Sequence, residues 1–316
     1  MSALYYPYFR GRQFELIALR ELVAENRLGD GRIIPVVEPV KLSSTLISTL
    51  QAFVDAGKDV GIVMNPVYGN FLDEVASSDE ETRNKVKDLF SKPNLLRAYI
   101  QRRNIDVVVE KQLKFISGNP ERSIAVYQSP EMLEASLALQ QKMGFSYGMN
   151  LVPDAISFRR KIRSNRILFH DCFNKKPRNS DYRDDVDELF SEDILYYADD
   201  GYSGFGDYSI IGQEYVDGGF APWAVAFHIV YKSSEGVLRI RHFVSDRNDG
   251  IEDAPGKFAE AARAFVEWLE SDGKDCKRTL GVKKICEAYQ SEQYPGLGAL
   301  KKFSIMHHLE LVSTMI

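Results

Sequence analysis

The chain has 316 residues, 44% of them hydrophobic and 27% charged, which is the balance of a globular protein rather than a disordered one. Its net charge of −5 argues against broad, non-specific binding to nucleic acid, which depends on neutralising phosphates with lysine and arginine. No apolar run approaches the roughly 20 residues that span a bilayer, and the first residues do not have the pattern of a signal peptide. Three cysteines without close pairing argue against a disulfide framework, so we expect a soluble, cytoplasmic protein.

Short apolar runs alternate with helical patterns over the first two-thirds of the chain. We expect strands at residues 5–9, 33–37, 60–64, 96–101, 123–127, 145–150 and 167–169. Helical patterns lie between them. In one, Leu46, Leu50 and Phe53 share a face and Ser43 or Ser44 is placed to cap the helix. Residues 106–116 are ambiguous between strand and helix. The alternation predicts βαβ units and a parallel sheet, here a (β/α)8 TIM-barrel-like fold.

The pattern changes after Phe173. Residues 201–207 are rich in glycine but do not match a dinucleotide-binding loop, so we expect a tight, irregular loop. Residues 224–231 and 237–244 predict a β-hairpin, and residues 299–312 a final helix. No linker divides the chain. We therefore interpret residues 1–316 as a single barrel-like domain with an elaborated C-terminal portion over residues 174–316.

Four of the expected strands end in a similar way. Each apolar run stops at a carboxylate or carboxamide, with proline one to three residues later: Glu38, Asn65, Gln128 and Asn150. Because the carboxyl ends of parallel barrel strands converge, these side chains would form a polar ring at the mouth of the barrel. The alternative is ordinary turn chemistry at strand ends, where such residues are favoured in any case.

Charged residues follow other strands. Arg10 and Arg12 come after the first strand and would suit a phosphate or carboxylate at the mouth, with ordinary surface arginines as the alternative. Asp171 ends the strand at residues 167–169, and Asp207 closes the glycine-rich segment. Acids at these places suit a divalent metal or general acid–base chemistry. A strand-end cap is the alternative for Asp171.

The expected hairpin brings two histidines together. If its loop covers residues 232–236, His228 pairs with Ile240 and Ala226 with His242, which places the two imidazoles diagonally on one face. They could bind a metal or transfer protons. Alternatively, both are core histidines bonded to the backbone.

The segment at residues 5–22 resembles the start of the bacterial and phage "beta" family, which opens with an aromatic-Pro strand, a basic residue and Gly, and a Gln/Glu-rich helix. Further resembling segments occur in the same order, at residues 33–39, 63–66, 206–208, 242–246 and 302–310. The resemblance implies a barrel-like α/β fold and a setting in mobile or phage-defence regions. It supplies no established catalytic residues. The family's motifs fall here on Arg10, Glu38, Asn65, Asp207, His242, Asp246 and His308.

Two functions remain open from the sequence. In the first, the mouth acts on a small anionic, phosphate-bearing ligand, with or without a divalent metal. Its catalytic candidates are Glu38, Asp171, Asp207 and His228, and its ligand-binding candidates are Arg10, Arg12, Asn65, Gln128 and Asn150. In the second, the protein is a non-catalytic component of a defence system that docks a partner protein encoded nearby. A nucleic-acid role rests only on the basic stretch at residues 159–166, for which a solvated helix face is the alternative.

Overall fold

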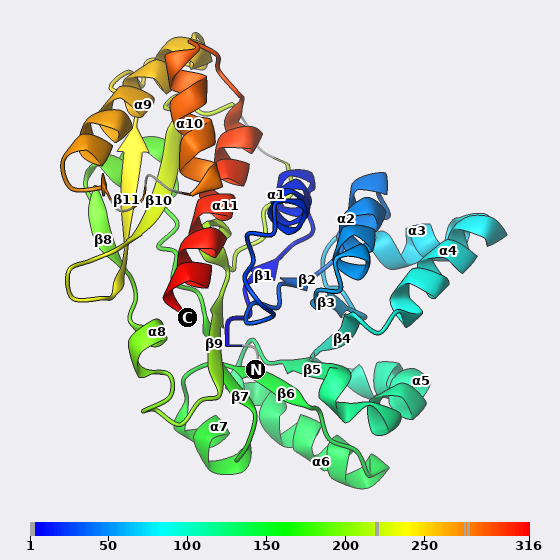
Figure 1. Ribbon diagram of the computed structural model, residues 1–316. Coiled ribbons are helices and arrows are strands. Elements are labelled where there is room, and N and C mark those ends of the chain that lie inside the picture. Colours follow the sequence, from blue (N-terminus) through cyan, green and yellow to red (C-terminus); the bar gives the residue numbers. More distant parts are fainter. Residues whose placement is uncertain (1–3, 219–220, 275, 277–278) are drawn as a thin grey trace. The chain divides into compact units, whose positions relative to one another are not determined.

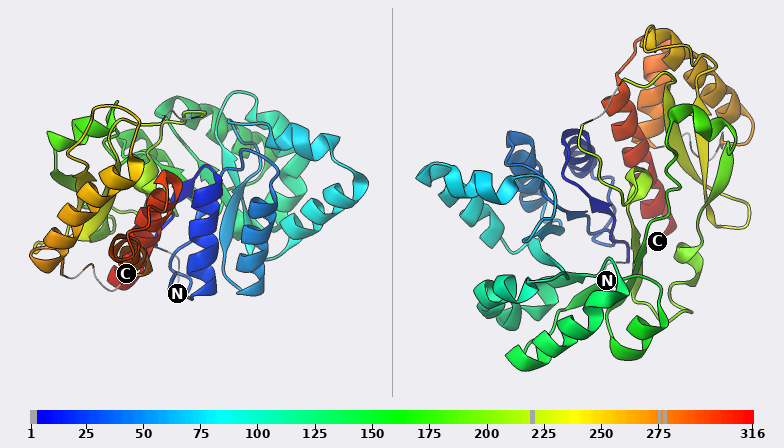
Figure 2. Two further views of the ribbon diagram at one scale, coloured as in Figure 1. Left: turned by 90° about the horizontal axis from the view of Figure 1, so that it is seen from above. Right: turned by 180° about the vertical axis from the view of Figure 1, so that it is seen from behind.

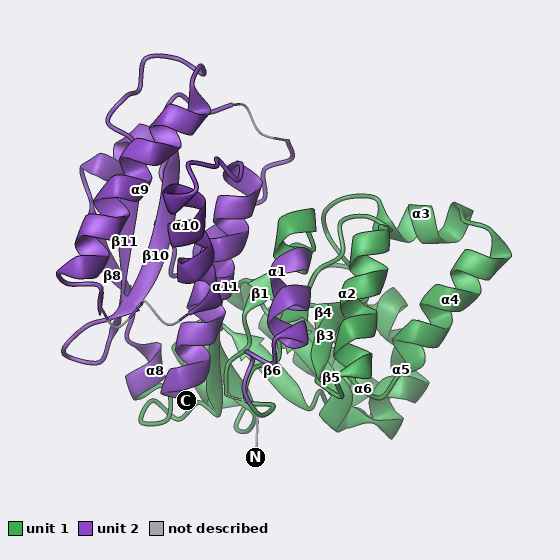
Figure 3. Cartoon of the chain, turned by 45° about the horizontal axis from the view of Figure 1, so that its top comes forward, with its two compact units in different colours: residues 1–16, 30–170, 196–208 green, residues 17–29, 171–195, 209–316 purple. Residues whose placement is uncertain are grey.

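The computed structural model describes residues 4–218, 221–274, 276 and 279–316. The chain divides into two compact units (Figure 3). Unit 1 comprises Met1–Leu16, Asp30–His170 and Tyr196–Tyr208, and unit 2 comprises Ile17–Gly29, Asp171–Leu195 and Ser209–Ile316. The main part of unit 2 thus begins close to the expected change of pattern at residue 174. The interpretation of residues 1–316 as a single domain stays a prediction.

Unit 1 contains a nearly closed, parallel eight-stranded sheet, which confirms the (β/α)8 barrel-like prediction (Figure 1). In order around the sheet, the strands are β1 (Tyr8–Phe9), β2 (Val36–Val37), β3 (Val60–Val63), β4 (Leu95–Ile100), β5 (Ser123–Val126), β6 (Met149–Val152), β7 (Arg166–His170) and β9 (Gly204–Asp207). A parallel bridge between Tyr5 and Phe205 joins the first strand segment to the last. The barrel therefore closes between the two ends of the sheet.

Helices follow most of the strands. They are α1 (Gln13–Ala24), α2 (Ser44–Asp55), α3 (Phe71–Ser77), α4 (Glu80–Ser91), α5 (Ile105–Gly118), α6 (Leu133–Met143) and α7 (Ile156–Lys161). Those from α2 to α6, blue to green in Figure 2, lie outside the strands. The Ser43 side chain caps α2 by accepting a hydrogen bond of 3.1 Å from the Leu46 N–H, as expected. The ambiguous segment at residues 106–116 is helical, within α5.

The glycine-rich segment was wrongly predicted as an irregular loop, because part of it is β9, the eighth barrel strand. The sequence lacks the β-branched residues that mark a strand, and the reason is steric. A Cβ on Gly204 or on Gly206 would collide with the carbonyl oxygen of Leu4 or of Tyr6. Glycine is required here because the N-terminal segment approaches the strand closely.

A second correction concerns Asn150. The strand β6 starts at Met149, so Asn150 is its second residue and not its end. The expected strand at residues 145–150 was placed too early, since the segment before Met149 is a loop that returns from α6. Asn150 consequently lies at the amino-terminal end of the barrel, opposite the expected polar ring.

Unit 2 is built on a three-stranded antiparallel sheet in the order β10 (Ala226–Lys232), β11 (Leu238–Val244) and β8 (Asp187–Ser191). Phe265 and Trp268 of α9 (Ala254–Glu270) pack on Phe227 and Phe243 of the hairpin. The remaining helices are the short α8 (Asp193–Tyr196), α10 (Leu280–Gln290) and α11 (Leu297–Met315), the last of which packs against α10 and β10. Short 3-10 turns cover Pro120–Arg122, Pro130–Met132, Asn179–Arg183 and Ser209–Ile211.

The predicted hairpin exists, but its predicted register is wrong by two residues. Lys232, which was expected in the loop, pairs with Leu238, so the loop covers residues 233–237 instead of 232–236. The Ser233 N–H donates to the Val237 carbonyl at 2.9 Å, which closes the turn one residue later than expected. His228 and His242 therefore lie directly opposite each other, not diagonally.

Helix α11 buries two adjacent histidines in unit 2. The His307 Nε2–H donates to the Val230 carbonyl at 2.5 Å, and its Nδ1 lies 2.8 Å from the Thr279 hydroxyl. The His308 Nδ1 lies 2.9 Å from the Ser209 hydroxyl. Burial lowers the pKa of His307 to about 4 and that of His308 to about 3, so both imidazoles are neutral at pH 7.

The structure bears on the expected absence of a membrane-spanning segment and on the surroundings of the cysteines. Among the described residues, no helix is both long and apolar enough to cross a membrane. Cys276 is buried, and Cys172 and Cys286 are half-buried. The divalent metal and the partner protein stay predictions.

Candidate functional site

A buried ion pair lies at the carboxyl ends of the first two barrel strands. Strands β1 and β2 pair with Phe9 opposite Val37, so the next residues, Arg10 and Glu38, come level with each other. Arg10 Nη1 donates to Glu38 Oε2, and the two residues are only 3% and 0% exposed. The Tyr8 hydroxyl donates to the same oxygen at 2.8 Å, and the Val67 N–H donates to Oε1 at 2.6 Å. Both carboxylate oxygens of Glu38 are therefore engaged.

Three tyrosine rings surround the Arg10 guanidinium. Its central carbon lies 5.2 Å from the ring centre of Tyr8, 4.9 Å from that of Tyr68 and 5.3 Å from that of Tyr208. These are cation–π distances, and such contacts strengthen when water is excluded. Burial, reinforced by the Glu38 charge, raises the pKa of Tyr8 well above its usual value, so its hydroxyl stays a donor. In the sequence, only the aromatic character of these tyrosines could have indicated such a role.

The start of α1 is tied to the same ion pair. Glu15, in the first turn of the helix and 1% exposed, accepts the Arg10 N–H at 2.9 Å. Arg12 lies between them in sequence and is half-buried, and its N–H lies 3.4 Å from the same Glu15 oxygen. The backbone that carries both predicted arginines is thus held by a single carboxylate.

Asp207, at the end of β9, forms a buried hydrogen bond within unit 1. The Tyr5 hydroxyl lies 2.9 and 3.0 Å from its two carboxylate oxygens, and both residues are buried. The contact joins the last barrel strand to the first strand segment. Asp207 therefore supports closure of the barrel.

The amide residues of the predicted ring have different surroundings from one another. Asn65 donates to the Ile100 carbonyl and accepts from the Ile100 N–H, both at 2.9 Å, so it continues the pairing of β3 with β4. Gln128 follows β5, is half-buried, and forms no side-chain hydrogen bond within the described chain. Gln101, which the prediction missed, follows β4 and accepts from the Ser136 hydroxyl at 2.8 Å. It could have been found as an amide directly after an apolar run, but the pattern also required a proline.

Two of the predicted catalytic residues belong to unit 2. Asp171 accepts the Phe173 N–H at 3.0 Å with one oxygen and the Gln213 N–H at 2.7 Å with the other. Both oxygens hold loop backbone, which is the behaviour of a strand-end cap. His228, the second residue, joins a chain of hydrogen bonds within unit 2.

That chain runs from Glu188 through His242 to His228. His242 Nε2 lies 3.1 Å from Glu188 Oε1, and the two histidine Nδ1 atoms are 2.7 Å apart. Since a carboxylate only accepts, His242 donates through Nε2, and the neutral His228 must then donate through Nδ1. Asn174 holds the other Glu188 oxygen at 3.0 Å, and the Tyr182 ring packs within 4.6 Å of both imidazoles.

The geometry of the two histidines favours proton sharing over joint metal binding. Two nitrogens on one tetrahedral zinc lie about 3.4 Å apart, given a Zn–N length of about 2.0–2.1 Å, and the observed 2.7 Å is a hydrogen-bond distance. Burial lowers the pKa of His228 well below its usual value, and His242 lowers it further. Burial also lowers the pKa of His242, against the effect of Glu188. Glu188 is the partner that orients both rings.

The fold and the mouth together define a (β/α)8 barrel-like protein with a buried arginine–glutamate pair at the carboxyl ends of its first strands. Comparisons with family models, with curated proteins and with solved structures find no match to this chain. Function must therefore be argued from the geometry of the sites.

Proposed function

We propose that unit 1 binds a small anionic, phosphate-bearing ligand at the carboxyl ends of its barrel strands, with Arg10 as the group that recognises the anion. The observation that carries the proposal is the Arg10 guanidinium, 3% exposed, oriented by Glu38 and by three tyrosine rings. Binding sites of (β/α)8 barrels lie at this end of the strands. The planar fork of a guanidinium suits the oxygens of a phosphate group.

The energetics of the ion pair support a role in binding. Burying two charges costs several kcal/mol per ion, and well-packed apolar residues in place of such a pair are often as stable or more so. An ion pair retained at the functional end of the barrel is thus better explained by ligand recognition than by stability alone. Glu38 fixes the plane of the guanidinium and offsets its charge, which favours ligands that bring several oxygens.

A second candidate is a non-catalytic, cytoplasmic component of a phage-defence system that docks a partner protein. It is favoured by the state of the acidic residues. Glu38, Asp171 and Asp207 all accept hydrogen bonds within their own units, so none is presented as an uncommitted base. The defence setting rests on the resemblance to the "beta" family.

Ligand-induced stabilisation tests the first proposal. Purified protein is melted with inorganic phosphate, nucleotides and sugar phosphates, alongside Arg10→Lys and the matched control Arg83→Lys on the exposed face of α4. A ligand at about 100 times its dissociation constant should add about 2.7 kcal/mol to the free energy of unfolding. Arg10→Lys keeps the charge but loses the planar fork, so it should lose this stabilisation, whereas Arg83→Lys should keep it.

Two results would contradict the proposed anion site. Stabilisation that Arg10→Lys leaves unchanged, in a variant with the wild-type circular dichroism spectrum, would remove Arg10 from the site. No stabilisation by any of the compounds would favour the second candidate, and co-purification with proteins encoded nearby would follow.

A further inference from the structure

A groove of about 600 Å³ on unit 2 exposes a tryptophan side chain to solvent. Trp223, which lines it, is 59% exposed, more than any other large apolar side chain in the described part of the chain. The volume lies within the range of about 300–1,000 Å³ that is usual for binding pockets. Because an indole has a large apolar surface, and tryptophan is enriched where proteins bind one another, this exposure points to a binding surface.

The two loops that form the groove are fixed to each other. The Asn179 amide donates to the Ala224 carbonyl at 2.8 Å, which joins the loop before β8 to the segment that leads into β10. On the first of these loops, Asp181 accepts the Arg178 N–H at 3.1 Å. The groove is thus formed by backbone that is already ordered, so a ligand that docks there loses little affinity to the ordering of the protein.

Flat rings make up much of the apolar surface of this Trp223 groove. Pro177 and Pro222 line it beside the indole. Grooves lined by aromatic rings are the usual docking sites for segments in the polyproline II conformation, whose proline rings pack on the aromatic faces. The apolar part of the groove therefore suits a proline-rich peptide.

The polar groups of the groove complement such a peptide as well. Among the described residues, none accepts a hydrogen bond from the Trp223 indole N–H, the Arg178 guanidinium or the Asn248 amide. These groups can donate to a ligand. A polyproline II segment offers matching acceptors, because its carbonyl oxygens form no internal hydrogen bonds and its prolines have no N–H to satisfy.

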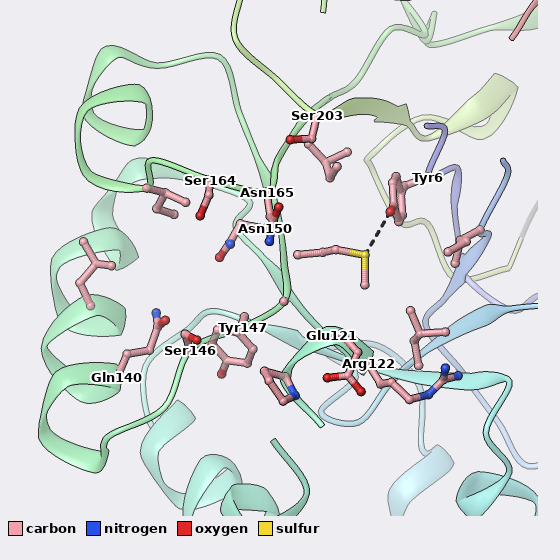
Figure 4. A pocket seen from close by; sticks show the side chains of 18 of the residues that line it. Tyr6, Glu121, Arg122, Gln140, Ser146, Tyr147, Asn150, Ser164, Asn165 and Ser203 are labelled. Carbon is pink, nitrogen blue, oxygen red and sulfur yellow. Dashed lines mark hydrogen bonds between the residues drawn. The ribbon is translucent and has the colours of Figure 1, made fainter. Parts of the chain in front are cut away.

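The cavity at the amino-terminal ends of the barrel strands in unit 1 has a different electrostatic character (Figure 4). It is larger, at about 910 Å³, and its lining residue Arg122 lies 3.5 Å from Asp59. Lys161, which also lines it, is paired with Glu134. In unit 2, by contrast, no carboxylate of the described chain lies within ion-pair distance of the exposed Arg178 guanidinium. Arg178 is therefore available to a carboxylate that a ligand brings.

We propose that the Trp223 groove docks a proline-rich segment of a partner protein, and that this segment carries an acidic residue. The proline rings pack on the indole, the backbone carbonyls accept hydrogen bonds from the donors of the groove, and the carboxylate pairs with Arg178. The groove belongs to unit 2 and its ligand is a peptide, so the inference goes beyond the anion site proposed for unit 1 and does not depend on it.

Tryptophan fluorescence measures binding at the groove directly. The chain has two tryptophans, and Trp268 is only 4% exposed, so acrylamide quenches mainly Trp223. The first probe is a synthetic peptide of prolines around one central glutamate, the second has proline in place of the glutamate, and the third has glycine and serine in place of the prolines. We expect the first peptide to protect Trp223 from acrylamide, the second to bind about two- to fivefold more weakly, and the third to give no protection.

Variants locate the binding, which calorimetric titration can follow without a fluorophore. Trp223→Ala should weaken binding of the glutamate peptide about tenfold or more, because a tryptophan at the centre of an interface carries much of its energy. Leu189→Ala, at a half-exposed apolar residue of β8, is the matched control and should leave binding unchanged. Arg178→Gln should bring the glutamate peptide to the affinity of the all-proline peptide, whereas Arg163→Gln, at another exposed arginine, should change neither.

The proposal is overturned if wild-type protein binds neither proline peptide, or if the glycine–serine peptide binds as tightly as the glutamate peptide. Binding that survives Trp223→Ala, in a variant with the wild-type circular dichroism spectrum, places the peptide elsewhere. Self-association that rises with concentration and is lost in Trp223→Ala would assign the groove to a second copy of this chain. Arg10→Lys should leave peptide binding unchanged, so failure of the anion proposal and failure of this one are distinguishable.

Discussion

The two units bury polar groups in opposite electrostatic states. In unit 1, Arg10 and Glu38 are buried as an ionised pair, held by hydrogen bonds and tyrosine rings. In unit 2, His307 and His308 are completely buried and neutral. A permanent charge can be buried only with a partner, whereas an imidazole can lose its proton instead. The paired charge lies where a barrel binds ligands, and the neutral histidines lie where a helix packs, so the two clusters should respond differently to acid and to mutation.

The largest expected difference is the response to acid. In the unfolded chain a histidine has a pKa near 6.5, above the values of about 4 for His307 and about 3 for His308. The unfolded state therefore takes up protons first, so the stability that comes from burying these histidines neutral is fully present above about pH 6.5 and is lost as the pH falls toward 4. At about 1.4 kcal/mol per pH unit for each group, His307 alone costs roughly 3 kcal/mol by pH 4.

Tryptophan fluorescence measures this loss in unit 2 alone, because the two tryptophans, Trp223 and Trp268, both belong to that unit. Urea unfolding followed by fluorescence between pH 7 and pH 4 should show the midpoint falling steadily below pH 6.5. His307→Gln, which keeps hydrogen-bonding atoms but cannot take up a proton, should make the dependence shallower. A midpoint that stays constant down to pH 4.5 would contradict neutral burial of the histidines.

The next largest effect concerns the ion pair in unit 1. Glu38→Ala leaves the Arg10 guanidinium buried beside tyrosines without its carboxylate, which should cost about 3–5 kcal/mol of the free energy of unfolding at pH 7. The double variant Arg10→Met with Glu38→Leu removes both charges and should recover most of that loss. Urea unfolding followed by far-ultraviolet circular dichroism checks both. A cost below about 1 kcal/mol for Glu38→Ala would mean that water reaches the pair.

A smaller effect is expected where barrel closure depends on one hydroxyl. Tyr5→Phe removes the donor that lies against both oxygens of Asp207, and a buried carboxylate that loses a partner costs about 1–3 kcal/mol. The exposed Tyr196 supplies the control, since Tyr196→Phe should change stability by less than about 0.5 kcal/mol. Equal thermal midpoints for the two variants would show that Asp207 does not depend on Tyr5.

Most of the barrel could be predicted from the sequence because its strands are buried on both faces. Runs such as Val60–Val63 and Ser123–Val126 are continuously apolar or small, and each was expected within a residue. Strand β9 could not be predicted in this way. Its glycines are required because the backbone of Leu4 and Tyr6, some 200 residues earlier in the chain, packs closely against them. Contacts between residues so far apart in the sequence produce no pattern in the local sequence around either of them.

The candidate sites show the same limit. Arg10 and Glu38 were found because each directly follows an apolar run, and the register of β1 and β2 brings them together. Asn150 also lies beside an apolar run, but at its start, and the sequence does not show which end of a short strand a polar residue occupies. Glu188 was missed as the partner of His242 because β8 is short and polar, so nothing in its sequence marks it as a strand.

The bridge between Tyr5 and Phe205 also has a consequence for synthesis on the ribosome. A nascent chain that ends before β9 carries seven strands whose two outer edges have no partner, and open strand edges pair readily with other chains. Closure must wait for a segment about 200 residues downstream of the first, and such distant pairing is slow to form. Premature termination or a pause in translation between β7 and β9 would therefore expose the barrel to aggregation for as long as the eighth strand is missing.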